Sequence, residues 1–215
     1  MPGVTISSGF GAGGSVVAPA VARALGLTLI DRAISAKVAA RLQVTVQEAE
    51  DGTPKQSFGA RFLQLLAPLG GGVWGAGTDS APLDDLLPED EATRFREQSE
   101  QVLAEAMAAG AVVLGRAGAA AFRNTPGVLR VRLFGDPEKR IAQAARIEGL
   151  SEADARALLT KTDKARAHYV RRLYQVNVDD PALYHLQIDS TALSLEACTA
   201  LIVAAYRSQY PADPE

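Results

Sequence analysis

The sequence predicts an α/β protein built on a parallel β-sheet with helices on both faces. Three observations support this fold class: five short strand candidates, the first of them β-branched, helical periodicity between them, and a glycine-rich turn directly after the first strand candidate. Strands that alternate with helices pair in parallel, and ligands bind at the carboxyl ends of such strands. We therefore expect a five-stranded sheet in a single domain over residues 1–207, followed by a tail over residues 208–215.

The individual elements follow from hydrophobic period and from start and stop residues. The expected strands cover residues 4–7, 27–30, 111–114, 128–134 and 185–188. The expected helices cover residues 17–25, 34–42, 91–109, 137–147, 151 to beyond 166, and 194–206. Asp136 before Pro137 is a typical helix N-cap and first helical residue, and Ser151 with Asp154 forms a capping-box pattern. Pro19 falls beyond the first turn of its helix, where proline costs about 3 kcal/mol unless the helix starts late or kinks.

One stretch, residues 43–90, breaks the regular alternation by mixing glycines, prolines and acidic residues. A connection this long inside a compact domain is usually functional or mobile. We interpret it as an insertion over the binding site rather than as a linker between domains. Its apolar segment at residues 63–69 could form a homodimer surface or cap the core.

Composition limits the classes of function. The 215 residues are 47% hydrophobic and 22% charged, which suits one well-buried domain. A formal net charge of −3 argues against a nucleic-acid-binding surface, because such a surface needs a basic excess. No apolar run approaches the roughly 18 residues of a membrane helix, and no basic segment precedes an apolar one at the N-terminus. We therefore expect a cytoplasmic protein that binds small molecules, with no nucleic-acid or membrane partner.

The single cysteine, Cys198, lies in a helical apolar pattern and is expected to be buried.

The turn at residues 8–15, with the sequence Ser-Gly-Phe-Gly-Ala-Gly-Gly-Ser, has the chemistry of a phosphate-binding loop. Glycine permits positive φ angles and close approach, so several backbone N–H groups can bind one anion, and the following helix adds its N-terminal partial charge. The expected phosphate-binding residues are Gly9, Gly11, Ala12, Gly13, Gly14 and Ser15.

Two nucleotide-binding motifs fit this turn, and a purely structural strand-to-helix turn is a third hypothesis. Residues 9–14 satisfy the dinucleotide-binding spacing G-x-G-x-x-G, with Asp31 at the end of the next strand as a ribose acceptor. The alternative is the P-loop, G-x-x-x-x-G-K-[ST]. In that motif Ser8 replaces the first glycine, Gly14 stands where lysine belongs, and Ser15 stands where the Mg²⁺-binding hydroxyl belongs. The turn alone leaves these alternatives open.

Further blocks along nearly the whole chain resemble the cytidylate kinase-like family of P-loop nucleoside monophosphate kinases. These blocks are residues 4–7 with 11–14, 29–31, 113–116, 136–141, 149–155, 162–169, 180–186 and 188–190. Members of that family are similar in carrying glycine at the lysine position, and a nicotinamide enzyme would not explain the later blocks. The resemblance implies a three-layer P-loop fold with a helical monophosphate-binding insertion at about 43–90 and a lid at about 140–180. It also implies ATP-dependent phosphoryl transfer to a nucleoside monophosphate such as cytidylate, or to a similar small acceptor, with Mg²⁺.

Arginines are the side chains expected to carry phosphoryl transfer, because their planar cations bind phosphate oxygens in pairs. The candidate catalytic residues are Arg116, Arg166, Arg171 and Arg172, while Arg140 and Arg146 add charge to the expected lid. The resemblance implies that Arg116, directly after a strand, contacts the acceptor phosphate. It also implies acceptor contacts from Asp163 and Arg166, which share one helix face and could instead form an intrahelical ion pair. Arg171 and Arg172 could belong to a lid over ATP or to a solvated face.

Three further positions bear on metal binding and activity. Ser15 is the candidate Mg²⁺ ligand by its place in the motif. Asp31 could bind the acceptor, order Mg²⁺ through water, or cap the next helix. Gln143 stands at a position where members of the family that this chain resembles have a second arginine. The lysine of the P-loop motif is also missing. These two departures support a second hypothesis, a catalytically weak or inactive nucleotide-binding or regulatory protein of the same fold.

Overall fold

Five parallel strands form the centre of the molecule in the computed structural model, which describes residues 3–30, 97, 100–101, 103–115 and 117–210. In chain order the strands are β1 (Gly3–Ser8), β2 (Thr28–Ile30), β3 (Ala111–Leu114), β4 (Val128–Phe134) and β5 (Leu186–Asp189). Their spatial order is β2-β3-β1-β4-β5, so the first strand lies in the middle of the sheet. All four strand pairings are parallel, and the predicted five-stranded parallel sheet is confirmed.

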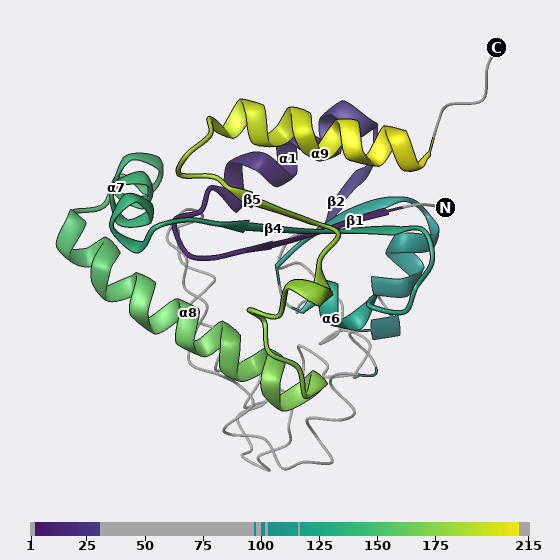
Figure 1. Ribbon diagram of the computed structural model, residues 1–215, viewed down its shortest axis with the longest axis horizontal. Coiled ribbons are helices and arrows are strands. Elements are labelled where there is room, and N and C mark those ends of the chain that lie inside the picture. The colour runs from purple at the N-terminus through teal and green to yellow at the C-terminus, as the bar shows by residue number, and fades with distance from the viewer. Residues whose placement is uncertain (1–2, 31–96, 98–99, 102, 116, 211–215) are drawn as a thin grey trace, which may run out of the picture.

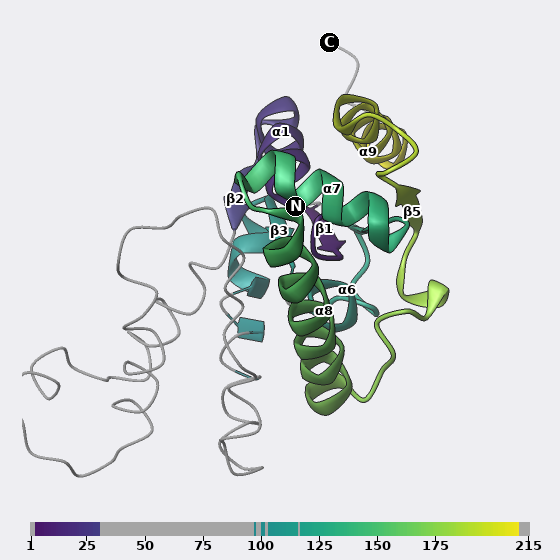
Figure 2. The ribbon, with the colours of Figure 1, turned by 90° about the vertical axis from the view of Figure 1, so that its left-hand side faces the viewer.

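Helices cover both faces of this sheet (Figures 1 and 2). The described helices are α1 (Gly14–Leu25), α6 (Gly118–Ala121), α7 (Pro137–Glu148), α8 (Glu152–Tyr174), the short 3-10 helix η3 (Pro181–Leu183) and α9 (Leu195–Gln209). Helices α1 and α9 lie on one face, α6 and α8 lie on the other, and α7 lies beyond the carboxyl ends of the strands. The sheet and its two helical layers therefore make the three-layer arrangement that the sequence predicts.

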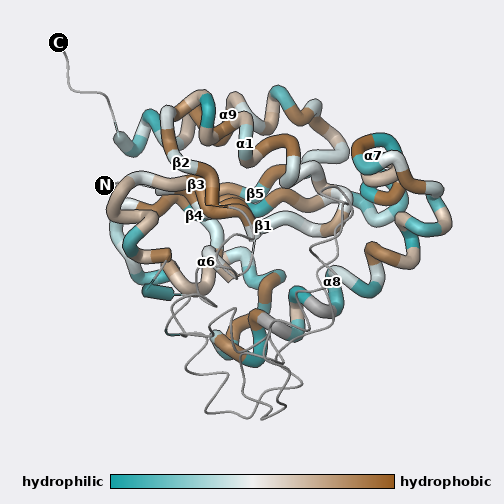
Figure 3. The backbone as a smooth tube through the Cα atoms, turned by 180° about the vertical axis from the view of Figure 1, so that it is seen from behind, coloured by the Kyte–Doolittle hydropathy of each residue, from teal (hydrophilic) through white to brown (hydrophobic). Residues whose placement is uncertain are grey.

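The main core lies between the sheet and the α1–α9 layer. Alternate residues of the central strands, such as Val4, Ile6 and Val131, are fully buried against apolar residues of α1 and α9, including Val17 and Ile202. Cys198 belongs to the same cluster, as predicted. Figure 3 shows the strands as the hydrophobic centre of the molecule, while hydrophilic segments mark the outer helices. This burial holds the carboxyl ends of β1 and β4 in place behind the glycine turn.

Local start residues explain where the helices begin. The Asp136 carboxylate accepts hydrogen bonds from two backbone N–H groups in the first turn of α7, and the Ser151 hydroxyl accepts one from Asp154 in α8. Helix α8 runs to Tyr174, beyond residue 166 as predicted. Pro19 lies inside α1, also as predicted. The two shortest helices, α6 and η3, were not expected from the sequence because neither is long enough to show a helical period.

Several predicted features lie outside the described residues. They are the insertion at residues 43–90 with its apolar segment, the helix at residues 34–42, Asp31 and Arg116. The predicted helix at residues 91–109 is helical wherever the structure describes it up to residue 108. Within the part of the chain that is described, none of the helices combines the length and apolarity needed to cross a lipid bilayer.

Candidate functional site

The glycine turn connects β1 to α1 at the carboxyl edge of the sheet, where ligands bind in open α/β folds. Gly11 and Gly13 have φ angles of 73° and 76°, in the left-handed region that side chains rarely adopt. Gly13 is also the N-cap of α1, and it has no side chain to satisfy the first N–H groups of that helix. The turn thus places the open N-terminus of a helix at the edge where a ligand is expected.

The carbonyl groups of this turn are held by the protein behind it. Four of them accept hydrogen bonds from distant side chains: Arg166 Nη1 to Ser8 O at 2.7 Å, Arg140 Nη1 to Phe10 O at 3.1 Å, Gln143 Nε2 to Gly11 O at 2.9 Å, and Ser190 Oγ to Ala12 O at 2.8 Å. The other two, on Gly9 and Gly13, accept N–H groups from within the turn or from α1. Every carbonyl from residue 8 to residue 13 therefore has a protein donor, which fixes the direction of the peptide groups.

The N–H groups of the turn divide into two sets. Three N–H groups have protein acceptors and so shape the turn. The Gly9 N–H donates to Leu133 O, the Phe10 N–H to the Asp163 carboxylate, and the Ala12 N–H to Gly9 O. The N–H groups of Gly11, Gly13, Gly14 and Ser15 have no partner among the residues that the structure describes. Gly13 and Gly14 are buried, and a buried N–H without a partner is costly unless a ligand or water accepts it. Donors at a glycine turn and helix N-terminus suit phosphate oxygens, so four of the six predicted phosphate-binding residues keep N–H groups available.

Helix α7 packs directly against the turn, and glycine is required there for space. A Cβ on Gly11 would lie under 3.0 Å from the backbone carbonyl of Arg140, and a Cβ on Gly9 would lie 2.6 Å from Arg140 Nη1. The Arg140 side chain is nearly buried and bonds to Phe10 O, to Gly135 O and to the Asp163 carboxylate. Arg140 is thus a structural support for the turn, a role that its sequence position alone did not indicate.

Asp163 and Arg166, predicted to share a helix face, both contact the turn. Asp163 Oδ1 accepts the Phe10 N–H at 2.9 Å, and Asp163 Oδ2 pairs with Arg140 Nη1 at 2.7 Å. Arg166 Nη1 reaches the Ser8 carbonyl. The salt bridge that the structure gives Asp163 joins it to Arg140 on α7.

The remaining predicted arginines lie apart from this group or outside the described residues. Arg171 and Arg172 lie in the last turn of α8, at the end remote from α7 (Figure 1). The sequence predicted a weaker helical pattern after them, and α8 does end at Tyr174. Arg116 cannot be placed relative to the turn because it lies outside the described residues.

Ser15 and Glu148 offer two hard oxygen ligands beside the turn. The exposed Ser15 hydroxyl lies 3.4 Å from Glu148 Oε1 at the end of α7, a weak hydrogen bond. Mg²⁺ usually keeps several waters and binds one or two protein oxygens together with substrate phosphates, so this pair fits such a site. Within the described ranges, no group of three or more acidic, histidine or cysteine side chains gathers to form an all-protein metal site.

Besides Arg140, three residues at the turn were missed by sequence reasoning as its supports. Gln143 was noted only as a departure from the family, yet its amide holds Gly11 O. Ser190, fully buried after β5, bonds to Ala12 O and to Phe134 O. The Leu195 side chain packs against Gly13, where a Cβ would lie 2.5 Å from Leu195 Cδ2. A polar residue directly after the last strand was the one sequence feature that could have indicated Ser190.

Comparisons with known proteins agree with this architecture. A crystal structure of an uncharacterized protein from Eubacterium ventriosum ATCC 27560 is similar with a TM-score of 0.66 at 17% identity, covering 96% of this chain and 98% of that one. A gluconokinase from Sinorhizobium meliloti 1021 has a TM-score of 0.49 at 14% identity, covering 96% and 92% of the two chains. The first similarity shows the fold, and the second is too distant to add to it.

Sequence comparison gives a curated relative and a family. A protein named uronate isomerase from Corynebacterium glutamicum is 29% identical over 133 residues, or 62% of this chain, and the chain spans only 25% of that relative's length. The family model described as "Cytidylate kinase-like family" matches residues 3–192, which include the whole sheet and the glycine turn. The fold is therefore the P-loop α/β fold, and the chain belongs to the cytidylate kinase-like family.

Proposed function

We propose that this protein transfers the γ-phosphoryl group of ATP to a nucleoside monophosphate of the cytidylate kind, or to a similar small acceptor. The observation that carries the proposal is the turn at residues 8–15: its carbonyls from residue 8 to residue 13 are all held by the protein, while four of its N–H groups keep no described partner. In the reaction, an acceptor oxygen bonds to the γ-phosphorus, the bond from that phosphorus to the β–γ bridging oxygen breaks, and ADP leaves. Membership of a kinase-like family supports this class of chemistry.

The residues of the turn have distinct roles in this proposal. The N–H groups of Gly11, Gly13, Gly14 and Ser15 bind phosphate oxygens, and their fixed direction means that little reorganisation is needed during transfer. Mg²⁺, held by Ser15 with Glu148 nearby, would supply positive charge to the phosphate oxygens. Phosphoryl transfer depends mainly on positioning and charge, so a rigid turn is the principal requirement.

The side chains that would complete the site remain part of the proposal. Arg116 at the end of β3 and Asp31 after β2 are the expected acceptor contacts, since both follow strands at the carboxyl edge. Asp163 acts by holding Phe10 and Arg140. Arg171 and Arg172 would act only if a second arrangement brought the end of α8 to the turn.

A thermal-shift screen followed by product analysis tests the proposal. ATP with Mg²⁺ should raise the melting temperature, and incubation with a panel of nucleoside monophosphates should yield ADP and one diphosphate product. The variant Arg116→Ala should reduce transfer while ATP still stabilises the protein. Turnover that is unchanged in this variant would remove Arg116 from the site.

A second hypothesis is a nucleotide-binding or regulatory protein without turnover. The glycine at position 14, the neutral Gln143 and the Leu195 side chain packed on Gly13 favour it, because each reduces charge or space at the turn. It predicts stabilisation by ATP with no ADP formed across the panel. Stabilisation by NAD(P) but not by ATP would instead support the dinucleotide-binding alternative.

One comparison widens the range of acceptors to test. Because the relative named uronate isomerase contains a region similar to this chain, sugar acids are a second acceptor class. Adding hexuronates and aldonates to the panel distinguishes the two classes. A phosphorylated sugar acid as the only product would replace the monophosphate assignment and keep the kinase assignment.

A further inference from the structure

The P-loop of this protein departs from its motif at two positions that contact each other. Ser8 replaces the first glycine of the motif, and Gly14 replaces the lysine that reaches the β- and γ-phosphates in other P-loops. A Cβ built on Gly14 would lie 2.7 Å from both Cβ and Oγ of Ser8 and 3.1 Å from Leu114 Cδ1. Real Cβ atoms essentially never come within 3.0 Å of another heavy atom, and Ser8 Cβ is fixed by its backbone. A side chain at position 8 therefore excludes one at position 14, so the two departures form a single exchange.

A positive charge reaches the same residue from another element. Arg166 Nη1 donates to the carbonyl oxygen of Ser8 at 2.7 Å, although the two residues are 158 positions apart. Three residues earlier on α8, Asp163 is bound to the Phe10 N–H and to Arg140. These contacts clamp α8 onto the turn at two successive points. The Arg166 guanidinium is thus held beside the residue whose side chain takes the space of the missing lysine.

We propose that Arg166 supplies from α8 the positive charge that other P-loops take from lysine. In this proposal, Ser8 in place of the first glycine and Gly14 in place of the lysine accompany the move of that charge to α8. The proposal rests on the proposed function for its phosphate ligand. Arginine suits the role because its guanidinium stays charged at any physiological pH, so it acts on a nearby phosphate through charge while it holds the Ser8 carbonyl. Arg166 is then a residue of the phosphate site rather than an acceptor contact alone.

The test compares variants that separate charge from structural support. Arg166→Gln removes the charge and retains a shorter polar amide, whereas Arg166→Lys keeps the charge. Arg207→Gln is the matched control, because Arg207 also donates to a distant backbone carbonyl, Ala24 O at 3.3 Å, on the opposite layer. Affinity for inorganic triphosphate, measured by calorimetry, is the primary measurement because it needs no acceptor.

We expect Arg166→Gln to weaken triphosphate binding about tenfold to a hundredfold, as loss of a charge-assisted hydrogen bond does. Arg166→Lys should stay within about fivefold of the native protein, since it retains the charge. Arg207→Gln should bind like the native protein. Native affinity in Arg166→Gln would overturn the proposal.

Restoring the lysine gives a second, independent test. The triple variant Ser8→Gly, Gly14→Lys, Arg166→Gln should recover at least about tenfold of the lost triphosphate affinity, because the charge returns by the motif's usual route. Gly14→Lys alone should lower the melting temperature through its clash with Ser8, and Ser8→Gly should relieve this loss. A triple variant that melts like the native protein and recovers no affinity would overturn the proposal.

The outcome is distinguishable from failure of the proposed function. If the native protein transfers no phosphate to any acceptor, the triphosphate measurements still decide the role of Arg166. If transfer occurs and Arg166→Gln retains the native rate, the kinase assignment stands and the Arg166 proposal fails. If the kinase assignment and the Arg166 proposal are both correct, Arg166→Gln should lower the rate of phosphoryl transfer by a factor on the order of 10²–10³, as removal of a transition-state donor does.

Discussion

At the scale of single residues, both the backbone conformation and the packing at position 11 require glycine. Its φ of 73° lies in the left-handed region, and a Cβ there would meet the Arg140 carbonyl at under 3.0 Å. Gly149, which ends α7 with a φ of 68°, meets nothing within 4 Å. The two glycines share a conformation and differ only in surroundings.

This pair makes a controlled prediction. Gly11→Ala should destabilise the protein by more than about 3 kcal/mol, because the left-handed conformation and a clash with backbone both oppose it. Gly149→Ala should cost only about 1–2 kcal/mol, since conformation alone opposes it. Urea denaturation of both variants measures the difference, and equal losses would show that α7 does not press on the turn.

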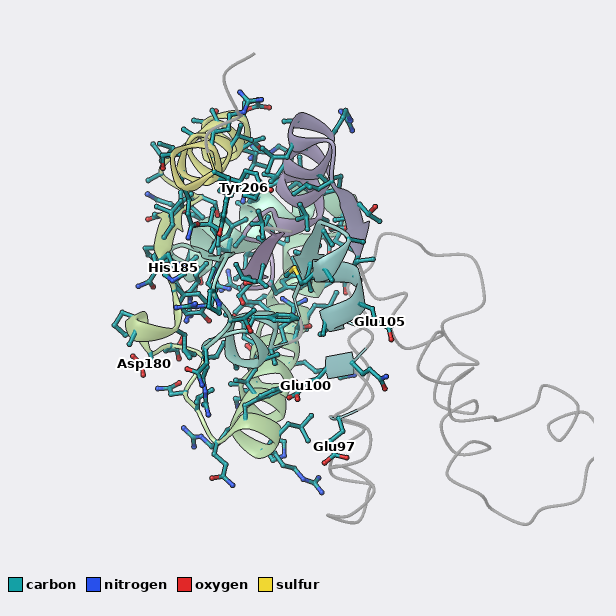
Figure 4. The ribbon with its side chains drawn as sticks, turned by 90° about the vertical axis from the view of Figure 1, so that its right-hand side faces the viewer. Glu97, Glu100, Glu105, Asp180, His185 and Tyr206 are labelled. Carbon is teal, nitrogen blue, oxygen red and sulfur yellow. The ribbon has the colours of Figure 1, made fainter. Side chains whose placement is uncertain are left out.

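A second residue, His185, makes stability depend on pH. It lies directly before β5 (Figure 4), and its Nδ1 accepts the Arg130 N–H at 3.2 Å. Burial and the nearby Arg130 cation lower the pKa of His185 below its usual value. The unfolded chain therefore takes up the proton first, near its usual pKa of about 6.5. The contribution of neutral His185 to stability is present above that pH and is lost as the pH falls through the lowered pKa of the folded protein.

The expected result is a fall in melting temperature from pH 7 to pH 5 that is steeper in the native protein than in His185→Gln. Glutamine keeps an acceptor oxygen but does not titrate, so it isolates the proton-linked part. Scanning calorimetry at half-unit pH steps measures both. Parallel curves for the two proteins would contradict the prediction.

At the scale of elements, α7 and α8 act together as a clamp on the glycine turn. Arg140 and Gln143 from α7 and Asp163 and Arg166 from α8 all bond to its backbone. The family resemblance implies a lid over about residues 140–180, and in this structure the first part of that region packs against the glycine turn. The two helices also share the exposed ion pair of Glu138 with Arg156.

The clamp predicts unequal effects for its two ion pairs. Arg140→Met should destabilise the protein by about 3 kcal/mol. The substitution removes a nearly buried guanidinium that pairs with the Asp163 carboxylate and donates to the Phe10 carbonyl. It should also weaken ATP binding, since the turn loses its support. Arg156→Met is the matched control and should leave stability unchanged within error, because exposed pairs contribute little. Equal effects in chemical denaturation would reject the clamp.

At the scale of the whole molecule, the parallel sheet gathers distant segments at one edge. β1 lies between β3 and β4, so the turn after it is met by residues that follow β4 and β5. Ser190 reaches Ala12 across 178 positions, and Arg166 reaches Ser8 across 158. The site is therefore a property of the complete domain, and ligand binding should stabilise the fold as a unit.

Ligand-linked stability tests this at the same scale. ATP at about 100 times its dissociation constant should raise the free energy of unfolding by about 2.7 kcal/mol. Inorganic triphosphate should give a similar effect at matched saturation, and adenosine should give little, because in the proposed function the available N–H groups bind phosphate. Stabilisation by adenosine equal to that by ATP would place the principal contacts on the base instead of the turn.

Much of the fold could be predicted from the sequence because its determinants are local. Short strand patterns predicted all five strands, and Asp136 and Ser151 marked the starts of α7 and α8. The bounds shifted by a few residues, as with α9, which extends to Gln209 beyond the expected end at residue 206. The glycine turn was identified from a pattern of the same short range, and phosphate binding by its six named residues stays a prediction.

The site beyond the turn could be predicted only in part. The family resemblance singled out Asp163 and Arg166 as acceptor contacts, which stays a prediction, and the structure shows both bonded to the backbone of the turn. The supporting roles of Arg140, Gln143 and Ser190 were missed, because each depends on a contact between residues more than a hundred positions apart.

By itself, the sequence determined the α/β class, the order of elements and the glycine turn, because period, capping and β-branching act between residues a few positions apart. Only the tertiary structure decided which donors hold the turn, which N–H groups stay available, and that Ser8 occupies the space of a side chain at position 14. The physical reason is range: Phe10 and Asp163 are 153 positions apart, and only the packed sheet and helices bring their atoms within 2.9 Å.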